Sequence, residues 1–453
     1  MQELIREREQ ELSPIANREG YSQYLLDRII QRTARVGVIG LGYVGLSLAT
    51  EWARAGFSVT GIDIDPRRVS MCQQGKSWIT DVASEDIGAL VREGSLIPTT
   101  DFTVLAGLDA VAICVPTPLN KAKEPDLGAI LDVVNAIASY LHPGQLIVLE
   151  STTYPGTTDE CILPYLQQTG LNVGVEYFLA FSPERIDPGN THYNLRNTPK
   201  VVAGITPACL EVTRALYETA VDTVVSVGST RTAELIKLFE NTFRAVNMGL
   251  VNELAIIADL LGVDVWETIA AAATKPFGFM PFYPGPGIGG HCIPIDPLYL
   301  AWKLRSLNYE PRFIELASEI NERMPHYVVE RINRALNSVD KYLNGSRILL
   351  VGVTYKRDTG DIRESPAIEI IELLRELQAH IDYADPYIPA LTLKETTLTA
   401  VPLDEEHMRG SDCVVIITDH QAYDYASIAR TASLVVDTRN ATAGIGQSHI
   451  RRL

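Results

Sequence analysis

Apolar runs alternate with amphipathic stretches over the first half of the chain. Residues 36–40 form a short apolar run that leads into a glycine-rich loop, an amphipathic stretch covers residues 46–56, and a second apolar run covers residues 57–65. Short apolar runs are typical of buried strands, and this order is that of a βαβ unit. The pattern therefore predicts a doubly wound α/β domain with a mainly parallel sheet. Three further strand candidates alternate with helical stretches: residues 108–115, 146–152 and 177–182.

The pattern becomes helical beyond about residue 230. Residues 232–263 carry apolar side chains at helical spacing, and a helix this long and apolar is usually buried on two sides, often in a dimer core. Prolines and glycines then interrupt the pattern, and a second strand-rich region begins near residue 346. The predicted fold class is α/β, with two Rossmann-like domains joined by a central helical dimerisation domain. The predicted parts are an N-terminal helical extension (1–33), a first Rossmann domain (34–225), the helical domain (226–343) and a C-terminal domain (344–453).

The composition restricts the classes of partner. The 453 residues carry a formal net charge of −17, whereas proteins that bind nucleic acid or anionic membranes are usually basic, so we expect neither partner. No apolar run reaches the roughly 18 residues of a transmembrane helix, and the charged N-terminus lacks the apolar core of a secretory signal. The six cysteines are scattered without a CxxC pair, which argues against a metal site and a disulfide framework and favours the cytoplasm.

A glycine motif follows the first predicted strand. Gly40-Leu41-Gly42-Tyr43-Val44-Gly45 is a GxGxxG that opens a helix, and such glycines let backbone N–H groups approach a pyrophosphate. Asp63 ends the next strand, where a carboxylate accepts hydrogen bonds from ribose hydroxyls and favours NAD over NADP. Arg68 is nearby and suits a 2′-phosphate instead, but NAD remains the predicted cofactor. Other ligand loops are expected at the ends of neighbouring strands, at Thr117, Ser151 and Thr152.

Cys292 differs from the other five cysteines, which we interpret as small buried hydrophobes. It lies between glycines that let a ligand approach the backbone, and polar residues flank it. Asp296 precedes Pro297 and a helical run, so it is expected as an N-cap with proline at the first helical position. A helix N-terminus near a sulfur helps to lower a thiol pKa, and Cys292 is therefore the candidate nucleophile.

Lys237 and Asn241 are four residues apart on the long predicted helix and therefore lie on one face of it. A solvated surface is the ordinary explanation of such a pair. Here both residues interrupt an otherwise apolar stretch, and a lysine and an asparagine that project into a cleft could donate hydrogen bonds to an oxyanion.

These residues resemble one known family. The chain is similar to the UDP-glucose and GDP-mannose dehydrogenases from about residue 34 to about residue 445, through several motifs in one continuous order. That resemblance implies an NAD-binding Rossmann domain, a helical dimerisation domain and a C-terminal nucleotide-sugar domain. The matching segments are residues 36–49, 115–118, 150–158, 181–190, 233–242, 284–296, 352–367 and 436–442.

The resemblance also implies a reaction, a four-electron oxidation of a sugar C6 hydroxyl to a carboxylate. The thiolate of Cys292 captures the intermediate aldehyde as a thiohemiacetal, a second oxidation gives a thioester, and water hydrolyses it. By position in the motifs, Lys237 and Asn241 would stabilise the oxyanion and Asp296 would assist proton transfer. Glu184 and Thr152 would handle the hydrolytic water.

The ligand residues implied by the resemblance fall into two sets. Those for NAD add Arg363 to the glycine-loop residues, Asp63, Arg68, Thr117, Ser151 and Thr152. A UDP-sugar is the implied substrate, and its diphosphate suits Lys356 and Arg439, which are expected to be its charged partners. The remaining substrate residues are Glu184, Arg185, Lys237, Asn241, Phe282, Tyr283, Gly287, Gly289 and Tyr355.

The chain departs from the family pattern at two places. Many members carry an arginine, in a segment before the cysteine loop, that reaches the sugar across the dimer, and here Lys275 is the nearest counterpart. A second glutamate of the hydrolysis motif is replaced by Pro188, so only Glu184 carries over. Residues 275–287 most resemble the branch that acts on UDP-N-acetylglucosamine, with UDP-glucose, UDP-N-acetylmannosamine, UDP-N-acetylgalactosamine and GDP-mannose as alternatives.

Two further hypotheses belong to other classes. A hydroxyacid-type dehydrogenase would perform a single hydride transfer without a cysteine nucleophile, and the cysteine loop and third domain count against it. An NAD-bound sensor would give Cys292, Lys237, Asn241, Asp296 and Glu184 no purpose. The product of the favoured reaction is expected to feed surface polysaccharide synthesis.

Overall fold

The structure is a computed structural model that describes residues 20–79, 81–120, 122–187, 190, 192–394 and 396–453. Residues 1–19, and with them most of the predicted N-terminal extension, lie outside the described residues, as does Pro188. The chain divides into two compact units, Met1–Phe239 and Glu240–Leu453, and each is described by itself. The predicted helical domain, residues 226–343, is shared between these units, and its boundaries remain a prediction.

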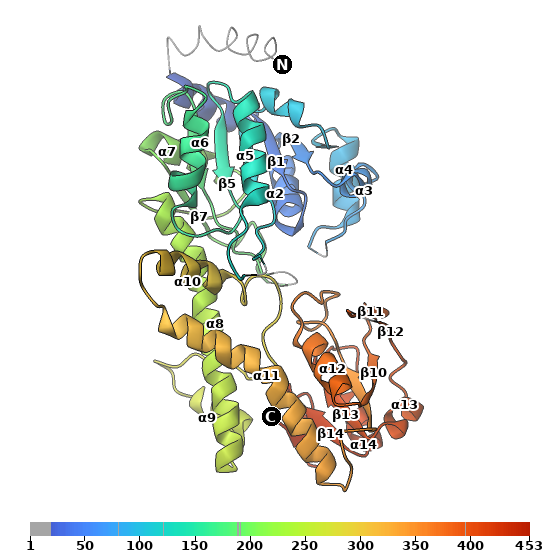
Figure 1. The fold of residues 1–453 in the computed structure, drawn as a ribbon. Helices are drawn as coiled ribbons and strands as arrows, with labels where there is room; N and C mark the ends of the chain where they lie inside the picture. The colour runs from blue at the N-terminus through green and yellow to red at the C-terminus, as the bar shows by residue number, and fades with distance from the viewer. Residues whose placement is uncertain (1–19, 80, 121, 188–189, 191, 395) are drawn as a thin grey trace. The chain divides into compact units, whose positions relative to one another are not determined.

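The first unit is built on one eight-stranded sheet (Figure 1). Its strands pair in parallel except β6 and β7, which are antiparallel. Every residue of β4, β5 and β6 is buried, as expected for central strands covered on both faces. In spatial order the strands are β3 (Leu96–Thr99), β2 (Ser58–Ile62), β1 (Arg35–Ile39), β4 (Ala110–Ile113), β5 (Leu146–Leu149), β6 (Phe178–Phe181), β7 (Lys200–Gly204) and β8 (Val224–Ser226).

Helices cover both faces of this sheet because each presents an apolar stripe to it. Helical residues 20–30 belong to one apolar layer through Leu25 and Ile29, so the described part of the predicted extension is built into this core. That layer also holds α2 (Tyr43–Arg54), α3 (Pro66–Gln73), α4 (Ser84–Arg92) and α7 (Pro207–Tyr217). The opposite layer holds η1 (Phe102–Gly107), α5 (Gly128–Tyr140), η2 (Thr157–Ile162) and α6 (Leu163–Gln167).

The second unit contains a parallel five-stranded sheet and a group of helices. Helices α11 (Arg312–Asn337) and α12 (Pro366–Glu376) cover one face of the sheet, and α13 (Glu405–Gly410) and α14 (Tyr425–Thr431) cover the other. The strand order is β10 (His380–Ala384), β9 (Arg347–Val351), β13 (Cys413–Ile416), β14 (Val435–Asp437) and β15 (Ile450–Arg452), with a separate hairpin of β11 (Ala390–Thr392) and β12 (Thr397–Thr399). The other helices are α9 (Val265–Ala272), α10 (Asp296–Ser306) and α8 (Thr230–Leu261), of which α8 crosses the boundary between the units.

The predicted long helix is present as α8, a single helix of 32 residues. Of the helices in the described ranges, none is long and apolar enough to cross a membrane.

Candidate active site

The glycine loop of the first unit has the form that a dinucleotide requires. Gly40 has a φ of +92°, and a Cβ there would lie 2.5 Å from the carbonyl oxygen of Cys114, whereas a Cβ on Gly45 would overlap the carbonyl oxygen of Gly40. A Cβ on Gly42 would meet no described atom within 4 Å. The first and third glycines are therefore needed for the loop itself, and the second leaves open space beside the backbone.

Helix α2 begins at this loop, with Gly42 as its N-cap. Within the described part of the chain, no side chain caps α2, and its first turn holds no acidic residue. The N–H groups of the first turn and the helix dipole at such an end favour an anion. The observed geometry therefore fits the pyrophosphate of a dinucleotide.

Asp63 is tied closely to the loop. Its Oδ2 accepts a hydrogen bond of 2.7 Å from the N–H of Leu41, and its Oδ1 accepts one of 2.8 Å from the N–H of Asp65. Arg68 contacts Oδ2 at 3.4 Å. Asp63 thus holds the loop in shape, a role not predicted from the sequence, and its remaining lone pairs leave the predicted contact to a ribose open.

The neighbouring strand ends gather at the same edge of the sheet. Ser151 is buried and donates a hydrogen bond of 2.8 Å to the carbonyl oxygen of Val115, so the segments after β4 and β5 are joined. Thr117 is also buried, whereas Thr152 is half-buried. This arrangement puts the predicted cofactor residues of the first unit on one edge.

Glu184 follows β6 on this edge and has more partners than the sequence indicated. Its Oε1 accepts hydrogen bonds from the N–H groups of Arg185 and Ile186 at 2.6 and 2.7 Å, and its Oε2 accepts one of 3.0 Å from Nζ of Lys200. Nζ of Lys200 also donates to Glu150 at 2.7 Å. Arg185 itself donates to the carbonyl oxygen of Pro199 at 2.7 Å.

A second buried carboxylate, Glu234, joins α8 to the loop after β5. Its oxygens accept hydrogen bonds from the N–H of Gly156 at 2.5 Å and from the N–H and hydroxyl of Thr158 at 2.9 and 2.7 Å. Glu234 precedes Lys237 by three residues on α8. Lys237 and Asn241 are both buried, at 8% and 6% exposure, so a solvated surface does not explain this pair.

In the second unit, Asn241 donates a hydrogen bond of 2.5 Å to Oδ2 of Asp296, which is itself buried. The expectation that Asp296 is an N-cap is wrong, because α10 begins at Asp296 and its cap is Ile295, with no side-chain cap in the described structure. The carboxylate turns to Asn241 instead of to the helix backbone. The N–H of Asp296 accordingly bonds to the carbonyl oxygen of Cys292 at 2.8 Å, which fixes the cysteine one turn before the helix.

The cysteine loop packs on the segment after β9. A Cβ on Gly289 would overlap Tyr355 and lie 2.7 Å from the carbonyl oxygen of Glu364, and Gly290, with a φ of +86°, donates to the carbonyl oxygen of Arg363 at 2.9 Å. The thiol of Cys292 is exposed, and the charge of Arg363 interacts with it. A guanidinium near an exposed sulfur is a typical environment of reactive cysteines.

Arg439 lies beside the same loop. A Cβ on Gly285 would lie 2.6 Å from its NH1, so the glycine makes room for the guanidinium. Burial lowers the pKa of Arg439, although Asp419 and Asp437 oppose this effect. Among the described residues, its guanidinium donates one hydrogen bond, of 2.9 Å, to the carbonyl oxygen of Ile417. A half-buried cation hydrogen-bonded to a carbonyl group rather than to a carboxylate fits an anionic ligand such as a diphosphate.

Aromatic contacts and a buried amide pair hold the segment before the cysteine. Phe282 packs edge-on against Phe243 at 5.9 Å between ring centroids, and Tyr283 stacks on Trp266 at 6.3 Å. Asn252 accepts a hydrogen bond of 3.0 Å from the N–H of Gly285 and donates one of 2.9 Å to Asn321. These contacts fix the backbone of the loop that carries Cys292.

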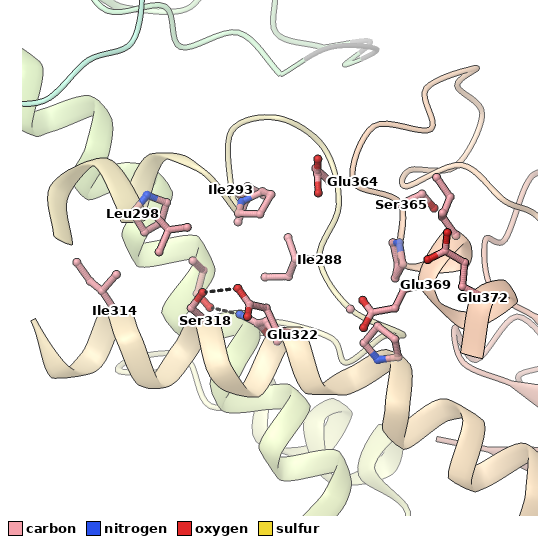
Figure 2. A pocket seen from close by; sticks show the side chains of 18 of the residues that line it. Ile288, Ile293, Leu298, Ile314, Ser318, Glu322, Glu364, Ser365, Glu369 and Glu372 are labelled. Carbon is pink, nitrogen blue, oxygen red and sulfur yellow. Dashed lines mark hydrogen bonds between the residues drawn. The ribbon is translucent and has the colours of Figure 1, made fainter. Parts of the chain in front are cut away.

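A cavity of about 610 Å³ lies between this loop and helices α11 and α12 (Figure 2). Gly287 and Ile288 line one side, and Glu322, Glu369 and Glu372 line the other. Burial raises the pKa of Glu369, and the charges of Glu322 and Glu372 add to the effect. So many carboxylates make this cavity a poor site for a diphosphate, although it adjoins the cysteine loop.

The remaining predicted residues have simpler surroundings. Lys275 places Nζ 5.1 Å from the ring centroid of Phe277, and both residues are exposed. Lys356 is half-buried in the segment after β9. In the part of the chain that the structure describes, no three histidine, cysteine or acidic side chains are grouped so as to hold a metal ion.

Several residues at these sites were not predicted from the sequence, among them Lys200, Glu150, Glu234 and Asn252. Asn252 had a signal, because it lies eleven residues after Asn241, or three helical turns, and therefore on the same face of α8. The contacts of Lys200 and Glu150 had no such signal, since their partners are 16 to 67 residues away along the chain.

Three family models match the chain in order. Residues 34–221 match the NAD binding domain of the UDP-glucose/GDP-mannose dehydrogenase family, residues 231–323 its central domain, and residues 349–444 its UDP binding domain. Together these family models cover most of the chain, and they follow one another in sequence order.

The proteins most similar to this chain in the comparisons include several that are named as nucleotide-sugar dehydrogenases. The UDP-N-acetyl-D-glucosamine 6-dehydrogenase of Pseudomonas aeruginosa is 36% identical over 358 residues, which cover 79% of this chain and 83% of the relative. The NDP-N-acetyl-D-galactosaminuronic acid dehydrogenase of Ralstonia nicotianae is 36% identical over 432 residues, 91% of this chain and 98% of the relative. The solved structure of the UDP-D-ManNAc dehydrogenase of Pyrococcus horikoshii has a TM-score of 0.84 at 32% identity, and covers 92% of this chain and 98% of its own.

The comparisons confirm four predictions: the family, the two Rossmann-like sheets, NAD as the cofactor, and an NAD-dependent dehydrogenase as the class of enzyme. The chain belongs to the UDP-glucose/GDP-mannose dehydrogenase family.

Proposed function

We propose that this protein oxidises the C6 hydroxyl of UDP-N-acetylglucosamine to a carboxylate, in two steps, through a thioester on Cys292. The observation that carries the proposal is the cysteine loop of the second unit. The thiol of Cys292 is exposed and interacts with the charge of Arg363. Asp296, four residues after Cys292, is buried and accepts a hydrogen bond from Asn241 of α8. A cysteine that served only for packing would need neither the exposure nor the polar neighbours.

Each residue has a distinct task in this reaction. Cys292 attacks the aldehyde carbon to form a thiohemiacetal, and oxidation of that adduct gives the thioester. Lys237 and Asn241 donate hydrogen bonds to the oxygen that gains negative charge in each addition. Asp296 takes or returns a proton beside them. Glu184, with Thr152, positions and deprotonates the water that hydrolyses the thioester.

NAD, when bound, supplies the hydride acceptor for both oxidations. Its holding residues would be the Gly40–Gly45 loop at the N-terminus of α2, with Asp63 and Arg68 towards the ribose. Thr117, Ser151, Thr152 and Arg363 complete the proposed set. The open space beside Gly42 and the uncapped helix end support this assignment.

The nucleotide is assigned to the second unit, whose sheet belongs to the UDP binding domain. The half-buried guanidinium of Arg439 beside Gly285 is suited to a diphosphate, and Lys356 adds a second charge. We assign the sugar end to the cysteine loop, with Phe282, Tyr283, Gly287, Gly289 and Tyr355, together with Glu184, Arg185, Lys237 and Asn241.

The choice of sugar rests on similarity to relatives rather than on a pocket shape. The relatives compared above are named for N-acetylglucosamine, N-acetylgalactosaminuronic acid and N-acetylmannosamine, which supports an N-acetylated sugar. UDP-N-acetylmannosamine and UDP-N-acetylgalactosamine are therefore the main competitors, ahead of UDP-glucose and GDP-mannose. We assign the product, formed in the cytoplasm, to surface polysaccharide synthesis.

We also propose that the protein is a homodimer or a higher homo-oligomer. Leu250, Ile257 and Leu261 form one stripe along α8 and are 61%, 44% and 70% exposed. A stripe of large exposed apolar side chains on a long helix is typical of an interface. The occupant that we propose is the same stripe of a second copy.

The experiment that tests the proposal uses the four competing UDP-sugars side by side with purified enzyme and NAD. Preferred turnover of UDP-N-acetylglucosamine, with the uronate as the product, is expected. A Cys292→Ser variant should form no acid, because serine gives no thioester. Acid formation by this variant at the wild-type rate would contradict the covalent route.

A further inference from the structure

A chain of buried ionisable side chains runs inward from Glu184, and the proposed function uses only its first member. Nζ of Lys200 lies 3.0 Å from Oε2 of Glu184 and 2.7 Å from Oε2 of Glu150. The hydroxyl of Tyr217 donates to the other oxygen of Glu150. The side chain of Glu184 is 10% exposed, that of Lys200 is 2% and that of Glu150 is 0%, so Glu184 is the end that reaches the surface.

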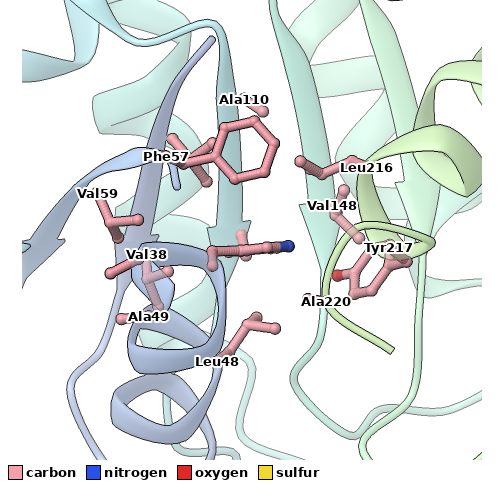
Figure 3. Close-up of a cluster of buried hydrophobic side chains, with 14 of the residues drawn as sticks. Val38, Leu48, Ala49, Phe57, Val59, Ala110, Val148, Leu216, Tyr217 and Ala220 are labelled. Atoms are coloured by element: carbon pink, nitrogen blue, oxygen red, sulfur yellow. The ribbon is translucent and has the colours of Figure 1, made fainter. Parts of the chain in front are cut away.

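The topology of the sheet brings these residues together. Glu150 follows β5 and Glu184 follows β6, and both strands end at the same edge. Because β7 runs antiparallel to β6, its first residue, Lys200, begins at that edge. Tyr217 is the last residue of α7 and stands among apolar side chains that include Val148, Leu216 and Ala220 (Figure 3). The ring of Tyr217 also packs against Trp52, at 5.5 Å between ring centroids, and Nζ of Lys200 lies 5.7 Å from its centroid.

One cation between two carboxylates leaves the cluster unevenly charged. Burial alone raises the pKa of Glu184, but the charge and hydrogen bond of Lys200 and the N–H groups of Ile186 and Arg185 outweigh it, so this pKa lies below its ordinary value. Burial raises the pKa of Glu150 to about 7, and the charge of Glu184 adds to the effect against that of Lys200. Lys200 therefore keeps the outer carboxylate ionised, and the inner one carries the exchangeable proton.

A purely structural core would be served as well by apolar residues of similar size, since buried ion pairs add little to stability. From this geometry we infer that Lys200 is a positioning residue, which holds Glu184 ionised and oriented as the base for the hydrolytic water, while Glu150 and Tyr217 hold Lys200. This inference rests on the proposed function, because it concerns the thioester step.

The step balances without a further reactant. An O–H bond of water breaks and its proton goes to the Glu184 carboxylate, while the water oxygen bonds to the thioester carbon. Collapse of this adduct breaks the carbon–sulfur bond and returns the electron pair to the sulfur of Cys292. The enzyme thiolate and the sugar acid are the products, and the proton on Glu184 passes to solvent.

The test compares Lys200→Met with Lys200→Arg, and uses Lys341→Met as the control. Lys341 is a half-exposed lysine of the second unit that pairs with Asp412. Pre-mixed enzyme, NAD and UDP-N-acetylglucosamine are acid-quenched at intervals, and intact-mass spectrometry follows the acyl-enzyme between pH 5 and 9. Thermal unfolding checks that each variant is folded.

Without its counter-ion the buried Glu184 should become protonated more easily. In Lys200→Met we expect the acid limb, the pH range in which protonation of Glu184 slows the decay of the acyl-enzyme, to move up by about 1–3 pH units. The decay should therefore slow by roughly 10-fold near pH 5 and approach the wild-type rate above pH 8. In Lys200→Arg the acid limb should return to nearly the wild-type pH, because arginine keeps the positive charge. Lys341→Met should show the wild-type decay rate and the wild-type pH dependence. A folded Lys200→Met protein with the wild-type decay and limb would overturn the inference.

Two further outcomes separate the claims. If Lys200→Met does not fold, Lys200→Gln takes its place, because glutamine keeps a hydrogen-bond donor beside the two carboxylates but carries no charge. Its acid limb should move up as expected for Lys200→Met, and an unmoved limb would overturn the inference. If the wild type forms no acyl-enzyme, the proposed function fails and takes this role with it. A wild-type acyl-enzyme combined with an unshifted Lys200→Met removes the role of Lys200 alone.

Discussion

Replacing Glu234 by glutamine should remove a pH-dependent loss of stability from the first unit. Glu234 is fully buried and accepts hydrogen bonds from the N–H groups of Gly156 and Thr158 and from the Thr158 hydroxyl. Burial raises its pKa from the ordinary 4.5 to about 7, although these hydrogen bonds oppose the rise. The folded protein therefore prefers the neutral carboxyl group more strongly than the unfolded chain does.

The sign and size of the effect follow from this difference. Because the folded pKa lies above the unfolded one, the stabilisation by Glu234 is complete below pH 4.5 and is lost as the pH rises through 7. The rise in pKa corresponds to roughly 3 kcal/mol. The glutamine side chain is neutral at every pH in this range. Its amide nitrogen cannot accept a hydrogen bond, so one of the two backbone N–H groups loses its acceptor, which costs about 1–3 kcal/mol.

The assay is native-state hydrogen exchange at peptides from α2 and β5, which report the first unit, between pH 5 and 8. At pH 5 the free energy of unfolding of the first unit should be larger in the wild type than in Glu234→Gln. Between pH 5 and pH 8 this difference should fall by most of the roughly 3 kcal/mol. Glu218→Gln, an exposed glutamate that pairs with Arg214, should show no comparable trend. A constant difference between wild type and Glu234→Gln across this range would refute the reasoning.

Three other predictions address the cofactor loop, the cysteine loop and the interface. Gly45→Ala should lower the melting temperature and abolish NAD binding, because the new Cβ overlaps the backbone of the loop. Gly42→Ala should keep the melting temperature and weaken NAD binding alone, because its Cβ meets only the open space beside the backbone. Calorimetry measures both quantities. Asn241→Ala removes the amide that donates to the buried Asp296 carboxylate and, in the proposed reaction, to the oxyanion. It should lower kcat by about 10²-fold at saturating substrate, and an unchanged kcat would exclude an oxyanion role. Leu250→Glu should halve the mass measured by light scattering, and an unchanged mass would remove this stripe from the interface.

Much of the fold could be predicted from the sequence because its signals are local. The glycine loop, the parallel strands and the long helix each depend on residues that are close together along the chain. The antiparallel pairing of β6 with β7 could not be predicted, since strand direction changes no apolar pattern within either strand. Lys200 was not singled out, because its partners Glu150 and Glu184 are 50 and 16 residues away along the chain.

Candidate site residues could be predicted where they lie together in one segment of the chain. Contacts between distant segments could not be predicted. Cys292 and its glycines lie within a few residues of each other, and so they were recognisable. The cap expected at Asp296 failed because Asn241, 55 residues earlier, takes its carboxylate. Glu234 was not singled out because its partners, Gly156 and Thr158, are 76 to 78 residues away.

The central claim is a four-electron oxidation, and the number of NADH molecules released per sugar consumed tests it most directly. Both quantities can be measured in one reaction, NADH by absorbance and the sugar by chromatography. We predict two NADH per UDP-N-acetylglucosamine, with the uronate as the product. One NADH per sugar, with an aldehyde or ketone as the product, would contradict the thioester route and deprive Cys292 of its proposed role.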